Sequence, residues 1–145
     1  MKIKWKKRRL AILCAAVLVL VFLKSACSQK LAVRYYPVVS DKVEKPVILA
    51  VLTDLHSTFY GKDQGELIRT LQSCGPDAVL LVGDIADDKV PHDGTKVLLS
   101  AVGDIYPCFY VSGNHEYWSG EEPKIKQMIA SYGVRVLEGE CALLE

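Results

Sequence analysis

The sequence lacks several features that would tie it to nucleic acid, structural zinc or thiol redox chemistry. Its five cysteines form no Cys-x-x-Cys pair, which argues against a zinc ribbon and against a redox dithiol. Residues 1–28 contain seven Lys and Arg but no acid, whereas residues 29–145 contain eleven basic and seventeen acidic residues. A region about six charges negative repels a phosphate backbone, so we do not expect a nucleic-acid partner.

The composition nevertheless predicts a folded protein. Half of the 145 residues are hydrophobic, which is enough apolar material for a core. Cys74 and Cys108 lie beside apolar segments, where a free cysteine behaves as a small buried hydrophobic residue. We therefore expect free thiols at these two positions in preference to a disulfide.

Residues 1–28 have the pattern of a signal or membrane-anchor segment. Six basic residues within positions 1–9 precede residues 10–23, which carry no charge. A helix of this length rises about 21 Å, less than the roughly 30 Å hydrocarbon core, so the run fits either a signal peptide or a minimal anchor. Because positive charge stays on the cytoplasmic side, we expect a membrane-associated protein whose domain lies on the extracytoplasmic side.

The remaining chain predicts a short linker region and one α/β domain. Residues 29–46 contain a predicted strand at 31–39 and a charged connector, and residues 47–145 form the expected domain. Three apolar runs in the domain are short enough to be strands buried on both faces, and a fourth strand follows. These predicted strands are residues 47–53, 78–82, 108–112 and 134–137.

Amphipathic stretches separate these strands. Two predicted helices end near Gly75 and Gly103, and a third begins at a capping-box pattern formed by Ser119 and Glu122 and ends at Gly133. Alternating buried strands and amphipathic helices indicate βαβ units, and hence a largely parallel sheet with flanking helices.

Chemically active residue types follow three consecutive strands. Ligands bind beyond the carboxyl ends of parallel strands, so these positions should meet at one edge of the sheet. Carboxylate, amide and imidazole groups together suit divalent Mn, Fe or Zn. Each segment alone is also compatible with a turn or helix cap, but the order and spacing of all three favour a metal centre. The segments are Asp54-Leu55-His56, Gly83-Asp84-Ile85-Ala86-Asp87 and Gly113-Asn114-His115-Glu116.

These three segments resemble the first motifs of the calcineurin-like metallophosphoesterases, and most closely the membrane-tethered bacterial branch. The resemblance implies the N-terminal half of an α/β/β/α sandwich and two divalent metal ions. It also implies hydrolysis of a phosphoester by a hydroxide activated by the two ions. The anchor pattern of residues 1–28 suggests a lipid-linked or cell-envelope phosphate or pyrophosphate as substrate, and a small-molecule phosphoester is the other option. By the resemblance, the first ion binds Asp54 and His56, Asp84 bridges both ions, Asn114 binds the second, His115 assists the leaving group, and Asp87 and Glu116 orient the ligands.

One departure from the family pattern affects the predicted activity. No histidine follows His115, although the family has later histidine motifs that complete both metal shells. We therefore expect this sequence to be part of a longer protein and the 145 residues alone to have little turnover. The alternative is a non-catalytic, membrane-anchored remnant or scaffold, and a nuclease of the same superfamily is disfavoured by the acidic charge.

Other polar and aromatic residues near the motifs have two interpretations. His92 either contacts substrate or lies in a surface loop, and Tyr60 and Gln64 either line the site or shape a loop before a helix. Tyr117 and Trp118 either form an apolar part of the substrate site or pack beneath the following helix.

Overall fold

The first part of the chain is one long helix. The computed structural model describes residues 2–26 and 30–144, and the chain divides into two compact units, residues 1–32 and 33–145. Helix α1 spans Lys2–Ala26. Among the described residues, no helix combines the length and apolar character needed to cross a membrane. The predicted boundary between residues 28 and 29 lies outside the described residues.

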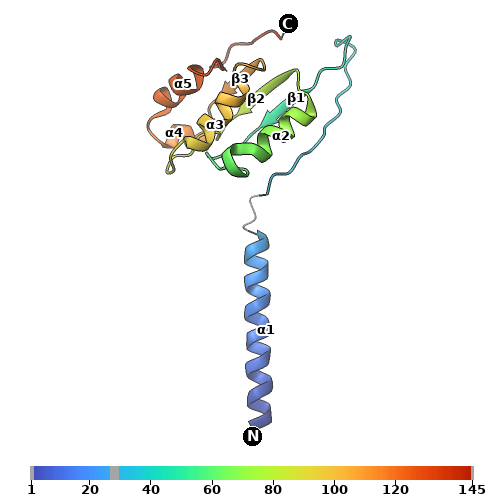
Figure 1. The fold of residues 1–145 in the computed structure, drawn as a ribbon, viewed down its shortest axis with the longest axis vertical. Coiled ribbons are helices and arrows are strands. Elements are labelled where there is room, and N and C mark those ends of the chain that lie inside the picture. Colours follow the sequence, from blue (N-terminus) through green and yellow to red (C-terminus); the bar gives the residue numbers. More distant parts are fainter. Residues whose placement is uncertain (1, 27–29, 145) are drawn as a thin grey trace. The chain divides into compact units, whose positions relative to one another are not determined.

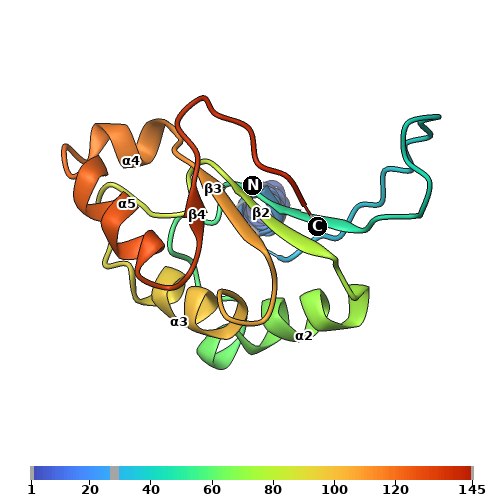
Figure 2. The same cartoon turned by 90° about the horizontal axis from the view of Figure 1, so that it is seen from above.

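The second unit contains a parallel sheet of four strands in the order β1-β2-β3-β4. Figure 1 labels β1, β2 and β3, and Figure 2 labels β4. Each strand pairs in parallel with the next along the chain, which confirms the fold class expected from the alternation of strands and helices. The strands are β1 Leu49–Leu52, β2 Ala78–Val82, β3 Cys108–Val111 and β4 Arg135–Val136.

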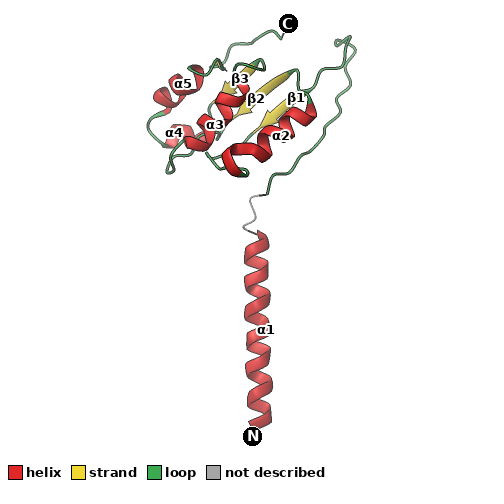
Figure 3. Cartoon of the chain, in the orientation of Figure 1, coloured by secondary structure: helices red, strands yellow, loops and turns green. Residues whose placement is uncertain are grey.

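Helices connect the strands, as the secondary-structure view in Figure 3 shows. Helix α2 ends at Gly75, which takes the left-handed conformation (φ 56°) that glycine adopts readily. The predicted capping box at Ser119 is wrong, because the residue before the helix is Glu121, whose N–H donates to Ser119 Oγ. The helical segments are η1 Lys62–Gln64, α2 Gly65–Cys74, α3 Asp93–Val102, α4 Asn114–Trp118 and α5 Glu122–Ala130.

The strand predicted over residues 31–39 is absent. Residues 30–40 have no regular secondary structure, and Val38 and Val39 are about nine-tenths exposed. A β-rich composition cannot form a strand without a neighbouring strand to accept its hydrogen bonds, and Pro37 also removes one donor.

Within the described residues 33–144, helices cover only one face of the sheet, which corrects the prediction that the strands are buried on both faces. Figure 2 shows α2 and α3 on the same side of the sheet. On that side Val79, Leu81 and Tyr110 are fully buried. Because side chains alternate along a strand, neighbouring residues point to the opposite side, and there Leu49 and Val51 remain about half exposed.

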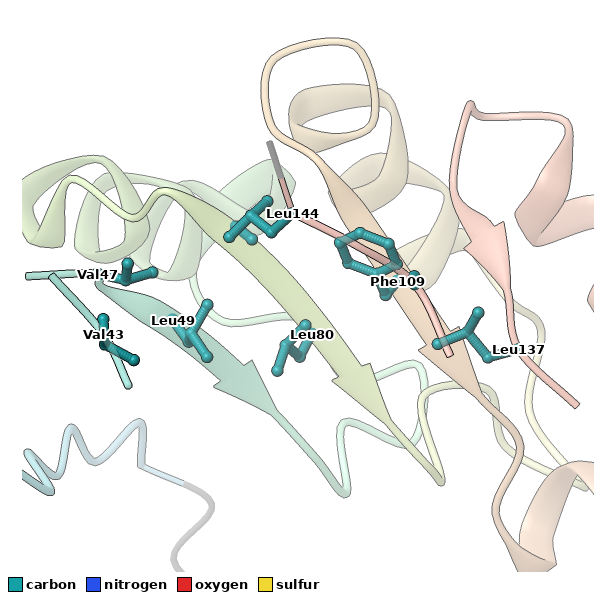
Figure 4. A pocket seen from close by; sticks show the side chains of 9 residues that line it. Val43, Val47, Leu49, Leu80, Phe109, Leu137 and Leu144 are labelled. Carbon is teal, nitrogen blue, oxygen red and sulfur yellow. The ribbon is translucent and has the colours of Figure 1, made fainter. Parts of the chain in front are cut away.

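The uncovered face forms an open apolar pocket that the chain beyond β4 crosses. Figure 4 shows side chains from the strands and from residues 137–144 gathered around it. The lining residues are Val43, Val47, Leu49, Ala78, Leu80, Phe109, Leu137, Ala142 and Leu144.

The expected free thiols are present. Cys74 and Cys108 are both free cysteines, and Cys108 is buried. Burial raises the pKa of the Cys108 thiol to about 11, so this side chain stays neutral at physiological pH.

Candidate metal centre

The loops that follow β1 and β2 are joined through their backbones. The N–H groups of Asp54, His56 and Ser57 donate to the carbonyl groups of Gly83, Asp84 and Ile85, over 3.3, 2.9 and 3.0 Å. The sheet therefore continues into the two loops as a short ladder. This ladder places the first two motifs side by side at the carboxyl edge, as the sequence predicts for a parallel sheet.

Backbone strain is concentrated in these loops. Asp54, His56 and Asp84 have φ values of 55°, 47° and 53°, in the left-handed region that residues with a side chain rarely adopt. Such conformations cost of order 1–3 kcal/mol each and persist only where surrounding contacts enforce them. The hydrogen bonds between the two loops are contacts of this kind.

The third loop is joined to the second by one buried carboxylate. Glu116 is fully buried, and its two oxygens accept four backbone N–H groups over 2.7–3.0 Å. Hydrogen bonds from several N–H groups satisfy both oxygens of a buried carboxylate and hold it in place. Glu116 thus fixes the loop that carries the second motif against the loop that carries the third. The donors are Asp84, Ile85, Ala86 and Gly113.

Gly113 permits this close approach. A Cβ atom at this position would lie 2.3 Å from Asp84 Oδ1 and 2.4 Å from the Asp84 backbone nitrogen. The same Asp84 Oδ1 accepts the N–H of His115 over 2.8 Å. The glycine is therefore required because the Asp84 carboxylate occupies the space that any side chain would need.

The structure brings His56, Asp84 and His115 together. Each offers one ligand atom, and these atoms lie within 4.8 Å of one another. The two imidazole rings meet edge to face, with their centroids 4.4 Å apart. Asp87, Asp88 and His115 form a second group by the same measure.

Asp54 and Asn114 lie at the rim of this cluster. The Asp54 side chain is 65% exposed, and its Oδ1 lies 4.0 Å from His56 Nε2. Asn114 is exposed and begins helix α4. Both residues come from the motifs that meet at this edge. Asp54 belongs to neither of the two compact groups of histidine and carboxylate ligand atoms among the described residues.

The chemistry of the donors fits a divalent metal ion. Two imidazoles and a carboxylate are ligands that Mn, Fe and Zn accept. His56 Nδ1 is buried yet has no hydrogen-bond partner, and its nearest carboxylate oxygen is Asp87 Oδ2 at 3.5 Å. An unpaired buried nitrogen is costly, and a bound ion would compensate for that cost.

Asp88 is a site residue that sequence reasoning did not single out. Its Oδ1 lies 2.8 Å from His115 Nδ1. This hydrogen bond raises the pKa of His115, aided by the negative charges of Asp84, Asp88 and Asp87 and opposed by partial burial. The same bond lowers the pKa of the Asp88 carboxyl. The only signal in the sequence was the second Asp directly after the Gly-Asp-x-x-Asp pattern.

The structure shows what Gln64 and His92 contact. Gln64 is fully buried, accepts the Tyr60 N–H, and donates to Thr58 and Gly94 carbonyl groups, so it shapes the loop before α2. His92 lies beside the motif loops, with Nδ1 3.4 Å from Ser57 Oγ.

The two aromatic residues after the third motif are exposed. Tyr117 is 72% and Trp118 65% exposed, which contradicts the interpretation that they pack beneath α5. The Trp118 ring lies 5.1 Å from the His115 ring, so this residue borders the candidate centre.

Comparison with known proteins identifies related sequences. The family model for calcineurin-like phosphoesterases matches residues 48–140. Proteins named uncharacterized metallophosphoesterase from two strains of Helicobacter pylori are 30% identical to the chain over 115 residues, covering 77% of this chain and 31% of each relative. An uncharacterized metallophosphoesterase from Campylobacter jejuni is 36% identical over 86 residues, covering 54% of this chain and 22% of that protein.

The chain therefore spans less than a third of the length of these curated relatives. No solved structure matches the chain.

Proposed function

Because the chain belongs to the calcineurin-like phosphoesterase family, we propose that the cluster at its sheet edge binds divalent metal ions and that the whole protein hydrolyses a phosphoester. The observation that carries this proposal is the convergence of His56, Asp84 and His115, whose ligand atoms lie within 4.8 Å of one another. His56 and Asp84 come from the loops after β1 and β2, and His115 comes from α4 after β3, so their meeting depends on the fold and not on any single motif.

The proposed ligands follow from the loops. Asp54 and His56 would hold one ion, Asp84 would contact both, and Asn114 would hold the second, with Mn, Fe or Zn suiting this donor set. Divalent ions at such a centre lower the pKa of bound water and neutralise charge on the phosphate. The ladder between the first two loops supports this arrangement because it holds His56 and Asp84 in register.

His115 is the proposed proton donor to the leaving oxygen. Its ring Nδ1 lies 2.8 Å from Asp88 Oδ1, and the ring is next to the proposed ligands His56 and Asp84. Its side chain is one-quarter exposed and can therefore reach a bound phosphoester. A positioned imidazole of this kind contributes about 10²- to 10⁴-fold to a proton-transfer step.

The proposed substrate of the whole protein is a small-molecule or lipid-linked phosphoester. The excess of acidic residues after position 28 supports this choice over nucleic acid. An extracytoplasmic location next to a membrane, inferred from the charge pattern of residues 1–28, stays a prediction.

We also propose that the sheet is one layer of an α/β/β/α sandwich. Its uncovered face carries apolar side chains, including Leu49 and Val51, at an exposure unusual for a finished core. A second layer against this face would bury them.

Metal titration of the 145-residue chain tests the proposed centre. Manganese binding, followed by the paramagnetic signal of the free ion, is expected to weaken at least about tenfold in Asp84→Asn and His56→Gln. His92→Gln is the matched control, because His92 contacts the same loops but belongs to neither ligand group. Equal affinity in all three variants and the unchanged chain would refute the assignment.

A further inference from the structure

We propose that the exposed ring of Trp118 binds the organic group attached to the substrate phosphate, and that the protein therefore favours phosphoesters with an aromatic group. This inference rests on the function proposed above and names the class of substrate. Trp118 is the last residue of helix α4 and lies three residues after the proposed site residue His115. The evidence is the orientation of this helix and the exposure of the ring.

Helix α4 has a buried side and a side that faces the candidate centre. Glu116, in the middle of the helix, is fully buried and bonded to the backbone of the motif loops. Residues three apart lie on the same side of a helix, so His115 and Trp118 share a side. Their rings are in contact, with centroids 5.1 Å apart and planes at 57°. The helix thus places the Trp118 ring beside the cluster of proposed ligands.

The backbone at Trp118 is held in place although its side chain is open to solvent. The N–H of Ser119 donates to the carbonyl group of His115 over 3.0 Å, and Ser119 Oγ donates to the carbonyl group of Glu116 over 2.6 Å. The exposure of Trp118 therefore belongs to the ring and not to a loose segment. A large ring that is held in place and left in water offers apolar area to a ligand.

Three aromatic rings lie in contact, one after the next, from the proposed ligands to the solvent. The His56 and His115 rings are 4.4 Å apart between centroids, and the Trp118 ring follows His115. Both histidine side chains are only partly exposed, whereas most of Trp118 is open. A phosphoester whose phosphate lies at the cluster would direct its organic group toward solvent, where the Trp118 ring can pack against it. Aromatic pairs at such centroid distances attract one another beyond the burial of their area.

Tyr117 provides a comparison within the same helix. It is as exposed as Trp118, but one residue along a helix is a rotation of about 100°, so it points in another direction. No ring contact of Tyr117 is found among the described residues. Tyr117 instead lines an open pocket with Gly120, Glu122 and Pro123. Exposure alone therefore does not distinguish the two aromatic residues, whereas proximity to His115 does.

Inhibition of the whole protein by two phosphonates tests the proposal. Phenylphosphonate and methylphosphonate have the same charged head group and differ only in the organic group. With manganese and p-nitrophenyl phosphate as the assay substrate, we expect phenylphosphonate to be the stronger inhibitor by at least about threefold. Trp118→Ala should weaken inhibition by phenylphosphonate about three- to tenfold, the size of one aromatic pair, and leave that by methylphosphonate nearly unchanged. Trp118→Phe should keep most of the preference.

Tyr117→Ala is the matched control, and both of its inhibition constants should equal those of the unaltered protein. Equal inhibition by the two phosphonates in the unaltered protein would overturn the proposal, and this result does not depend on whether any variant folds. Equal weakening of both inhibitors in Trp118→Ala would also overturn it, because Trp118 would then act by positioning His115. So would a loss of preference in Tyr117→Ala as large as that in Trp118→Ala.

Manganese binding separates this inference from the proposed function. Trp118 belongs to neither group of ligand atoms, so Trp118→Ala should bind manganese as tightly as the unaltered chain. Failure of the unaltered chain to bind manganese would refute the proposed function and this inference with it. Normal manganese binding without a preference for phenylphosphonate would refute only the role of Trp118.

Discussion

The inner and outer parts of the candidate centre are built differently. The inner part is a framework of backbone groups gathered around the buried carboxylate of Glu116, which accepts four N–H groups. The outer part consists of exposed side chains such as Asp54 and Asn114, for which the fold supplies position but little contact. The difference shows that hydrogen bonds within the chain hold these loops in place.

Because of this difference, replacing two residues of the same chemical type should have different effects. Glu116 and Asp54 are both acids within metal-associated motifs, but Glu116 is completely buried and bound only by the chain. Removing a framework residue should therefore reduce stability, whereas removing a rim residue should affect metal binding alone.

The largest effect on the framework is expected from Gly113→Ala. Its Cβ would lie 2.3 Å from Asp84 Oδ1, and the nearby Asp84 backbone nitrogen leaves no direction for relief. Because overpacking a tight site costs typically 1–3 kcal/mol and occasionally more, we expect a loss of at least about 3 kcal/mol in the free energy of unfolding. Urea denaturation followed by circular dichroism measures it.

Gly120→Ala is the control for this substitution. Gly120 has a positive φ of 68°, but a Cβ there meets nothing within 4 Å. Its cost should be only that of the left-handed conformation, about 1–2 kcal/mol. Equal losses at the two glycines would show that the close approach to Asp84 is not important.

Glu116→Gln should have the next largest effect. Glutamine has nearly the same shape, but its amide nitrogen would face N–H donors and leave at least one of them unpaired in a buried place. Since hydrogen bonds to a charged group contribute about 1.5–3 kcal/mol and an unpaired buried donor adds about 1–3 kcal/mol, we expect a loss of about 2–4 kcal/mol, measured by urea denaturation.

The exposed Glu121 provides the comparison for Glu116. Its side chain is more than half exposed and pairs with Lys124 on the surface, so Glu121→Gln should leave the unfolding midpoint nearly unchanged. If Glu116→Gln were equally harmless, the inner framework would not depend on its carboxylate.

Replacing an exposed residue of the outer part should weaken metal binding and leave stability nearly unchanged. Asn114 is exposed, and no hydrogen bond of its side chain is found among the described residues, so Asn114→Ala should change the free energy of unfolding by less than about 0.5 kcal/mol. Manganese titration should nevertheless show weaker binding in this variant. Destabilisation without any change in metal affinity would place Asn114 in the framework and contradict the division.

Sequence patterns predicted the parts of this arrangement that depend on order along the chain. The apolar runs located all four strands, and the motif spacing placed Asp54, Asp84 and Asn114 in loops at one edge of a parallel sheet. Strand order and motif position are local properties, because each βαβ unit sets where its next loop emerges.

Features that depend on three-dimensional partners were missed. Residues 31–39 have a strand-like composition but no strand beside them, and the apolar strands remain uncovered on one face because the connecting helices lie on the other. Asp88 and Asp87 are identical in type and adjacent in sequence, so only their geometry distinguishes the partner of His115. The hydrogen bonds of Glu116 likewise join two loops thirty residues apart.

The smallest difference in stability between variants is expected for Glu122→Gln. The Glu122 side chain is less exposed than that of Asp54 but is not fully buried like that of Glu116. Its carboxylate accepts the Ser112 hydroxyl and pairs with Lys126, and these contacts lower its pKa below the ordinary value of 4.5. A carboxyl with a lowered pKa contributes stability above its unfolded pKa and loses that contribution as the pH falls through its folded pKa. Urea midpoints of the unaltered chain and Glu122→Gln should therefore differ slightly at pH 7 and converge in acid.

Added salt should reduce the difference at pH 7, because a partly exposed ion pair is screened whereas the enclosed bonds of Glu116 are not. A difference that persists unchanged in acid would mean that the shape of Glu122, and not its charge, stabilises the junction between β3 and α5.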